Sequence, residues 1–226
     1  MADGQFSTSN KILASLKPAA LDLLVPHLKL VELPLRTELE KKRAPIKKVY
    51  FMESGMASVV DKVRTKDIEI GIIGREGMTG LSLVMGAPLP MQDIFIQIAG
   101  SAHAIAADRL RRAMTQNPDL QKAFLLYAYS FSLQAGQTAA ANGHGKLEER
   151  LARWLLMAHD RVEGDDVSLT HEFMAMMLGV RRAGVSVALQ HLADAGLIDT
   201  ERRVVIITNR RGLEKSAQGI YRSTSY

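Results

Sequence analysis

The sequence predicts an α+β protein: an antiparallel β-roll, then a long helix, then a helical domain that ends in a β-hairpin. Two observations support this fold class. Short apolar segments separated by glycine-containing turns recur between residues 28 and 105, as in β-rolls and barrels. From Asp108 onward, the spacing of the apolar residues changes to the period of a helix.

The first half of the chain is predicted to be a series of short strands joined by tight turns. Turns are expected at Glu53–Gly55, Arg64–Asp67 and Gly74–Gly77, where glycine and polar residues interrupt the apolar segments. Consecutive strands joined by such short turns are antiparallel, which predicts the β-roll. The expected strands are 28–33, 46–52, 56–60, 68–73, 94–98 and 102–105.

A long helix is expected to begin at Pro118, after a short helix at 108–114. Proline suits the first turn of a helix, where its missing N–H costs nothing. Apolar residues along this helix recur at nearly seven-residue spacing, which favours pairing with a second copy; the alternative is packing on its own β-domain. The expected dimerisation residues are Leu120, Phe124, Tyr127 and Phe131. A hinge is predicted at 142–145, followed by an amphipathic helix at 146–162.

Two short helices meeting at a glycine are predicted after the amphipathic helix. Thr170 is expected to cap the first helix, and Gly179 to end it. The second helix leads into a strand, a turn that carries Arg202 and Arg203, and the β-branched strand 204–207. A helix-turn-helix followed at once by a hairpin is the layout of a winged helix.

Polar side chains near the second helix and in the hairpin turn are candidates for contact with DNA. Arginine, serine and glutamine can bind phosphates or base edges, and Arg181 and Arg182 would begin the reading helix. The alternative is an ordinary helical hairpin with solvated arginines. The predicted DNA-binding residues are Thr170, His171, Arg181, Arg182, Ser186, Gln190, Arg202 and Arg203.

Composition excludes several kinds of protein. The 226 residues contain no cysteine, which excludes disulfides, cysteine-ligated iron–sulfur clusters and thiol redox sensing. The net charge of +5 and the pI of about 9.5 suit a nucleic-acid partner. Without a long apolar run or a signal peptide, a cytoplasmic location without membrane contact is expected. No hydrolase elbow, phosphate loop or zinc-protease motif is present, so no enzyme activity is expected.

From about Leu28 to Leu213, the chain resembles the Crp/Fnr superfamily of bacterial transcription regulators. The most specific segments are VYFMESGMASVV, IGIIGREGMTGL, LEERLARWLL and the helix-turn-helix. The resemblance implies a homodimer that binds a pseudo-palindromic double-stranded DNA operator. It also implies three parts: a sensor of the cyclic-nucleotide-binding type at 1–116, a dimerisation helix with its hinge at 117–145, and a winged helix-turn-helix DNA-binding domain at 146–226.

The effector pocket departs from the family pattern. In family members that bind cyclic AMP, a glutamate holds the ribose and an arginine meets the phosphate. The glutamate position falls here on Leu81 or Ser82, the arginine position falls on Gln92 beside Asp93, and residues 78–98 contain no Lys or Arg. A buried phosphate needs such a cation, so cyclic AMP is not expected to bind. The residues of this degenerate pocket are Gly80, Leu81, Ser82, Gln92 and Asp93.

Haem is not expected either, because no two of the six histidines have metal-ligand spacing. The basic run 41–48 is interpreted as a solvated loop and strand edge; the alternative is contact with DNA or RNA polymerase. Val187 lies where some family members have a base-reading arginine, so the operator sequence is not predicted.

The predicted function is a homodimeric, sequence-specific DNA-binding transcription regulator that is not controlled by cyclic AMP. The alternative is a cyclic-nucleotide or other small-ligand signalling module whose winged helix contacts protein.

Overall fold

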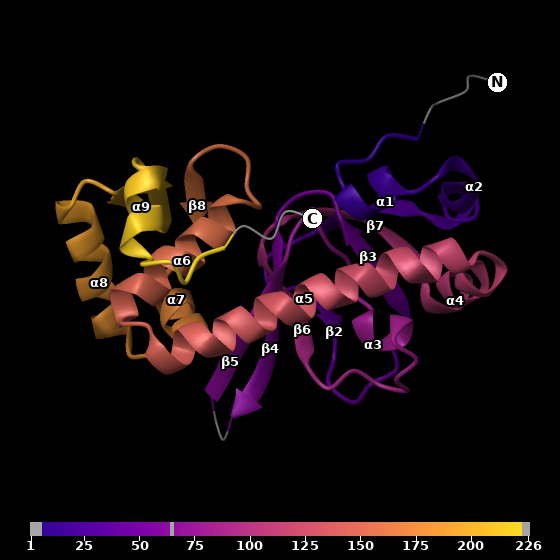
Figure 1. Ribbon diagram of the computed structural model, residues 1–226, viewed down its shortest axis with the longest axis horizontal. Helices are drawn as coiled ribbons and strands as arrows, with labels where there is room; N and C mark the ends of the chain where they lie inside the picture. The colour runs from indigo at the N-terminus through magenta and orange to yellow at the C-terminus, as the bar shows by residue number, and fades with distance from the viewer. Residues whose placement is uncertain (1–5, 64–65, 223–226) are drawn as a thin grey trace. The chain divides into compact units, whose positions relative to one another are not determined.

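The computed structural model describes residues 6–63 and 66–222 and has the predicted α+β architecture. The chain divides into two compact units, each described separately below. Figure 1 labels the helices and strands of the chain. Unit 1 comprises Met1–Val59 and Ile72–Tyr129, and unit 2 comprises Val60–Gly71 and Ser130–Tyr226. Helix α5 (Pro118–His144) contributes to both units. The domain boundaries expected at residues 116 and 145 stay predictions.

Strands β1 to β7 form two sheets, with strand orders β1-β7-β3 and β2-β6-β4-β5. The β1–β7, β3–β7 and β2–β6 pairs are antiparallel, as predicted. Sequence reasoning missed β2, which is three residues long and has an irregular register against β6. Of the hairpin tip predicted at Arg64–Asp67, Arg64 and Thr65 lie outside the described residues. The strands are β1 (Lys29–Leu33), β2 (Glu38–Glu40), β3 (Lys48–Met52), β4 (Met56–Val63), β5 (Lys66–Ile73), β6 (Asp93–Ile98) and β7 (Gly100–Ala106).

The core of unit 1 joins strands β3 and β7 to short helices and to the first half of α5. Val49 and Phe51 of β3 are buried while Tyr50 between them is half-buried, as the alternation of a strand requires. The ring of Phe51 lies 5.7 Å from the ring of Phe124 of α5, centroid to centroid. The helices are α1 (Lys11–Ser15), α2 (Pro18–Leu21), the 3₁₀-helix η1 (Val25–His27), α3 (Leu81–Val84) and α4 (Ala107–Gln116).

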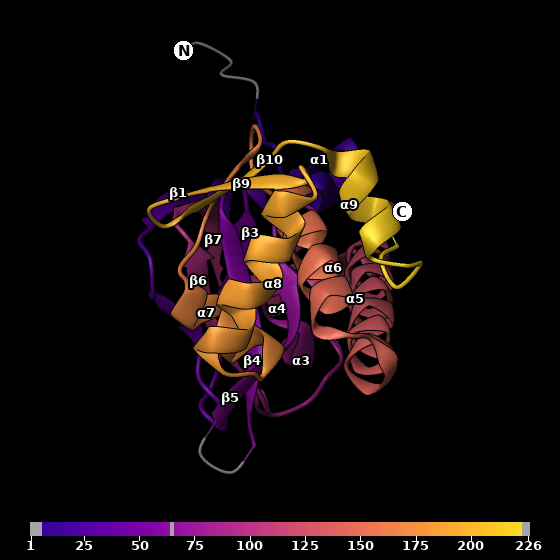
Figure 2. The ribbon, with the colours of Figure 1, turned by 90° about the vertical axis from the view of Figure 1, so that its left-hand side faces the viewer.

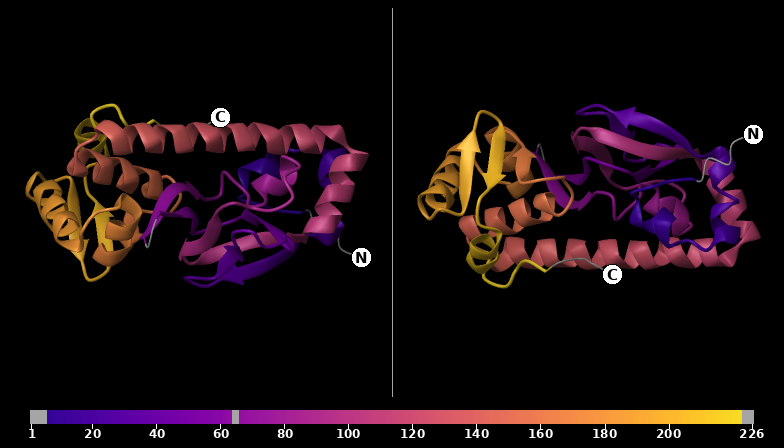
Figure 3. Two further views of the ribbon diagram at one scale, coloured as in Figure 1. Left: turned by 90° about the horizontal axis from the view of Figure 1, so that it is seen from below. Right: turned by 90° about the horizontal axis from the view of Figure 1, so that it is seen from above.

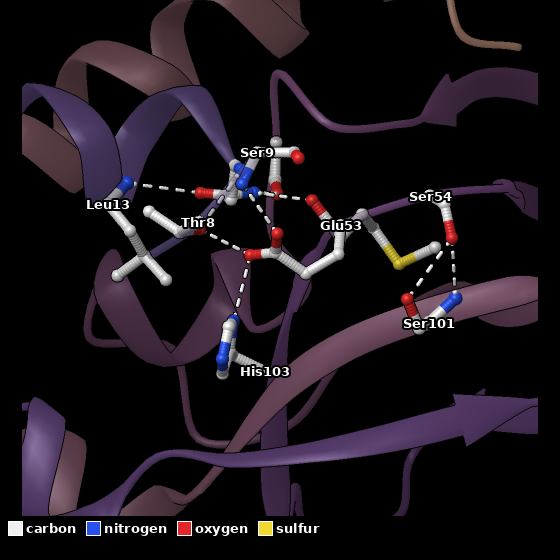
Figure 4. A network of polar contacts seen from close by, with 10 residues as sticks. Thr8, Ser9, Leu13, Glu53, Ser54, Ser101 and His103 are labelled. Atoms are coloured by element: carbon white, nitrogen blue, oxygen red, sulfur yellow. Dashed lines mark hydrogen bonds and ion pairs between the residues drawn. The ribbon is translucent and has the colours of Figure 1, made fainter. Parts of the chain in front are cut away.

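The N-terminal segment of unit 1 is fastened to the roll by two polar side chains. Asn10 caps α1 by accepting from the Leu13 N–H at 3.1 Å, and its amide donates to the carbonyl of Met52 at 2.9 Å. The Glu53 carboxylate accepts from the Ser9 N–H at 2.6 Å and lies 2.8 Å from Nδ1 of His103, as Figure 4 shows. These bonds position the chain before β1.

The apolar seam of α5 faces the chain's own core. Leu120 and Phe124 have no exposed surface and Tyr127 is 8% exposed, all within the core of unit 1. In unit 2, the Phe131 ring packs against Gly71, where an added Cβ would lie 2.8 Å from the ring carbon Cζ. Three of the four predicted dimerisation residues, Leu120, Phe124 and Tyr127, are therefore covered by the chain's own core, which favours the alternative that this seam packs internally, whereas Phe131 is half-buried.

Helix α5 is continuous up to His144 (Figure 3). The break predicted at 142–145 therefore comes later, since Asn142 and Gly143 stay helical and only Gly145 and Lys146 separate α5 from α6. Helix α6 (Leu147–His159) begins after Lys146, whose backbone N–H donates to the Glu149 carboxylate at 3.0 Å.

The C-terminal part of unit 2 is a small helical domain with a three-stranded sheet (Figure 2). Its core is built from the buried faces of α6, α7 and α8, including Leu151, Leu155, Met174 and Leu189. No helix in the described ranges is long and apolar enough to cross a membrane. The elements after α6 are β8 (Asp166–Ser168), α7 (His171–Leu178), α8 (Arg182–Asp194), β9 (Ile198–Glu201), β10 (Val204–Ile207) and α9 (Arg210–Ser216).

Candidate DNA-binding surface

Helices α7 and α8 form the predicted helix-turn-helix. The Thr170 hydroxyl accepts from the Phe173 N–H at 3.2 Å and so caps α7. Gly179 ends α7 with φ +66°, a left-handed conformation that glycine adopts without a steric penalty. Helix α8 begins three residues later, after the extended residue Arg181. The local sequence therefore fixes both ends of the turn.

One face of α8 is buried in unit 2 and the opposite face is exposed. Val185, Ala188, Leu189 and Leu192 face the core. The exposed residues at the start and along the outer face are Arg181, Arg182, Ala183, Val187 and Gln190. This face follows the glycine turn, as the reading face of a helix-turn-helix does.

Three predicted DNA-binding side chains on α8 already have partners in the free protein. Arg182 forms an exposed ion pair with Glu172 of α7, with 3.0 Å between Nη1 and Oε1. The Gln190 amide donates to the Asp194 carboxylate at 2.8 Å, within α8. In the third pair, Nδ1 of His171 lies 2.9 Å from the hydroxyl of Ser186. The structure thus brings two predicted DNA-binding residues, His171 and Ser186, into direct contact.

The predicted wing is the hairpin of β9 and β10, and its turn holds Arg202 and Arg203. Both side chains are exposed, and Arg203 has φ +66°, a left-handed conformation uncommon for residues other than glycine. Strand β8 pairs with the other side of β10 and makes the hairpin a three-stranded sheet. Sequence reasoning missed β8, because three residues carry too little alternation to identify a strand.

Arg150 of α6 supports the turn and was not predicted from the sequence. Its guanidinium donates to the carbonyl of Leu178, the last residue of α7, and its Nε donates to Oδ1 of Asn142 at 3.0 Å. Burial lowers the pKa of Arg150 from its ordinary value. A cation at the end of a helix satisfies free carbonyls there, so Arg150 helps to hold the end of α7 in place.

The five residues of the predicted effector pocket lie in unit 1, around the segment that follows β2. The Gly80 N–H, at φ +84°, donates to the buried carboxylate of Glu40. Asp93 accepts from the N–H of Lys42 at 2.7 Å. Two backbone N–H groups of this region therefore already bind carboxylates of the chain. Leu81 and Ser82 begin α3, Ser82 Oγ is buried with no hydrogen-bond partner among the described residues, and Gln92 is half-buried.

Residues 149–216 match the family model of the Crp-like helix-turn-helix domain. This part of the chain is therefore similar to Crp-like helix-turn-helix domains. The matched range contains α7, the glycine turn, α8 and the wing described above. A comparison with curated proteins finds no match.

Three of the solved structures that resemble the chain cover 87–93% of it. A transcriptional regulator of the Crp/Fnr family from Eubacterium rectale is 16% identical with a TM-score of 0.72, covering 93% of this chain and 99% of its own. FixK2 from Bradyrhizobium japonicum is 16% identical with a TM-score of 0.73, and the match covers 88% of this chain and 99% of FixK2. A CRP-family transcriptional regulator from Thermus thermophilus is 20% identical with a TM-score of 0.71, and the match covers 87% of this chain and 100% of the regulator. The chain therefore has the fold of Crp/Fnr regulators.

Proposed function

We propose that this protein is a sequence-specific DNA-binding transcription regulator that acts as a homodimer and is not controlled by cyclic AMP. The observation that carries the proposal is the exposed face of α8 within the Crp-like domain. Arg181 and Arg182 begin this helix, and Arg202 and Arg203 lie in the wing of the same domain. Arginines in these places can contact base edges and phosphates, respectively.

A second stripe on α5, distinct from the buried seam, supports dimerisation. Its residues lie alternately three and four positions apart, which is the spacing of a coiled-coil seam. Leu126 and Tyr129 in this stripe are 59% and 60% exposed. A Cβ added at Gly136 or Gly143 would meet no atom within 4 Å, so another helix can approach there. The proposed interface is Leu126, Tyr129, Leu133, Gly136, Ala140 and Gly143.

The absence of control by cyclic AMP is inferred from the charges around the predicted pocket. A cyclic phosphate would need a cation and free backbone N–H donors. Instead, the Glu40 carboxylate accepts from the Gly80 N–H, and Asp93 places a second carboxylate near the same segment. Two anions would repel a phosphate, so we expect no saturable binding of cyclic AMP in the micromolar range by calorimetric titration.

Selection of binding sites from a pool of random duplex DNA, with and without cyclic AMP, tests the proposal. The expected result is one enriched pseudo-palindromic sequence that is the same in both arms. Gel shifts with the selected duplex and with a scrambled duplex of equal length then measure specificity. Equal affinity for the two duplexes would contradict sequence-specific binding. A selected sequence that appears only with cyclic AMP would contradict the effector proposal alone.

A further inference from the structure

The centre of the exposed face of α8 is apolar, although the face is flanked by arginines. Val187 lies four residues after Ala183 and three before Gln190, so the three side chains share one face of the helix. Val187 is 55% exposed. In the described part of unit 2, it is the one large hydrophobic side chain that is strongly exposed. The inner face of α8 is occupied by other residues, so the core does not account for Val187.

A groove beside Val187 separates α8 from the start of α6. It has a volume of about 440 Å³ and is lined by Lys146, Leu147, Glu148, Ala183, Gly184, Val187 and Ala188. A Cβ added at Gly184 would lie 3.2 Å from Cδ2 of Leu147, which shows how closely the two helices approach on this side. The floor of the groove is apolar. Its lining carries both Lys146 and the carboxylate of Glu148. Arg181 and Arg182 stand at the start of the same exposed face of α8, so the partner of this face should be an anion that also presents an apolar group.

Duplex DNA presents both features in its major groove. Its backbone is anionic, and the C5-methyl group of thymine is the apolar feature by which base edges differ there. A valine placed against the amino or carbonyl groups of other bases would leave them without a hydrogen-bond partner, which is unfavourable. An exposed valine at the centre of a reading face therefore selects for thymine and against bases that need a polar partner.

We propose that Val187, together with Ala183, reads the methyl group of a thymine in each operator half-site, next to the base contacted by Arg182. This inference rests on the proposed function and refines it. It names the base that the apolar part of the reading face recognises. The half-site must then contain a thymine whose methyl group, and not only its hydrogen-bonding edge, contributes to affinity.

Replacement of single thymines by deoxyuracil in the selected duplex tests this proposal, because the exchange removes only the methyl group. Each symmetric pair of thymines is replaced in turn, and affinity is measured by fluorescence anisotropy. At one position, we expect a loss of about fourfold per half-site, the effect of exposing one methyl group. For Val187→Ala, the ratio between the thymine and uracil duplexes at that position should fall well below fourfold, because only Ala183 and a shorter side chain remain to contact the methyl group.

Leu30→Ala is the matched control, since Leu30 is similarly exposed but lies on β1 in unit 1. It should keep the wild-type ratio between the two duplexes. If no DNA is bound at all, both the proposed function and this inference fail. If DNA is bound specifically but every uracil duplex binds as tightly as its parent, only the inference fails. A uracil effect that Val187→Ala leaves intact would assign methyl recognition to another side chain and would also overturn it.

Discussion

Arg182 shows how a side chain on the proposed reading face is positioned in the free protein. Its guanidinium is paired with Glu172, and both side chains are more than half exposed, at 66% and 62%. An exposed ion pair of this kind contributes about 0–1 kcal/mol, so it can be exchanged for a base or phosphate at little cost. Glu172 therefore orients Arg182 in the free protein, and its charge opposes the approach of the DNA backbone.

Arg182→Ala should relax specificity at one base pair per half-site. An arginine on a recognition helix most often binds a guanine, and loss of that contact costs about 1–3 kcal/mol of discrimination. Binding to random DNA should change less. Repeated site selection with the variant would measure this, and an unaltered preference would show that Arg182 does not read a base. Glu172→Gln is the matched variant, because it releases Arg182 and should not reduce specific affinity.

The wing arginines should behave differently, since phosphates carry no sequence information. Replacement of Arg202 and Arg203 by Ala is expected to weaken binding to all sequences alike. Each lost phosphate contact should also reduce the slope of log K against log salt by about 0.9. Arg203→Gly is a useful control, because glycine removes the side chain and also relieves the left-handed backbone at this position. An unchanged slope in the double variant would contradict a wing–phosphate contact.

Glu40 is the residue whose ionisation should affect the stability of unit 1. Burial raises the pKa of this carboxyl above its ordinary value of 4.5, although the bonds from Gly80 and Thr79 act in the opposite direction. As pH rises through 4.5, the unfolded chain ionises first, so stability falls until the folded pKa is passed. Glu40→Gln removes this loss. The melting temperature of the variant relative to wild type should therefore increase from pH 4 to pH 7.

Glu38→Gln provides the comparison for this measurement, because Glu38 lies on the same strand with an exposed side chain. It should follow the wild-type profile over the whole range. If Glu40→Gln also follows that profile, the carboxyl of Glu40 titrates alike in the folded and unfolded chains.

At the scale of elements, α5 shows where sequence reasoning succeeds and where it fails. Its start at Pro118 was predicted, because proline has a definite place in the first turn of a helix. The environment of its apolar seam could not be predicted, because seven-residue spacing is the same whether a seam packs on the chain's own strands or on a second helix. Only burial distinguishes them, and it places Phe124 inside and Leu126 outside.

Leu126→Asp should therefore yield monomers that bind the selected operator weakly. A charge at a helix–helix seam would be buried without a partner in the dimer but remain solvated in the monomer. Sedimentation velocity would measure the change. Phe131→Asp serves as the contrast, since its ring packs on Gly71 and the substitution should lower folding stability instead. If Leu126→Asp remains dimeric, the interface lies elsewhere on the protein.

Across the whole molecule, the predictable elements were those fixed by local chemistry. The longer strands alternate, Thr170 and Gly179 bound α7, and the wing follows α8 directly. Strands β2 and β8 were missed because each is three residues long and depends on a partner strand from elsewhere in the sequence. Contacts between distant residues, such as Glu40 with Gly80 or Arg182 with Glu172, have no local signal at all.

Unit 2 contains one such distant contact that links residues 60–71 of the β4–β5 hairpin to α6. The indole N–H of Trp154 donates to the Glu69 carboxylate at 2.6 Å, and both residues are 4% exposed. Arg153 is buried beside them. Burial lowers the pKa of Arg153 to about 10. The negative charge of Glu69 opposes this shift, and the positive charge of Arg161 adds a smaller lowering. Glu69 therefore satisfies a buried donor and also offsets a buried cation.

Glu69→Ala should destabilise unit 2 and expose its tryptophan. Leaving the indole N–H without an acceptor costs about 1–3 kcal/mol, and the uncompensated charge of Arg153 adds to that loss. Trp154 is the only tryptophan in the sequence, so the emission reports on the surroundings of this one side chain. We expect a red shift of emission and a lower denaturation midpoint. Glu69→Gln keeps an acceptor for the indole and should shift the emission less, although it also removes the charge that Arg153 needs. Identical emission from all three proteins would show that the hairpin does not depend on Glu69 for its place on α6.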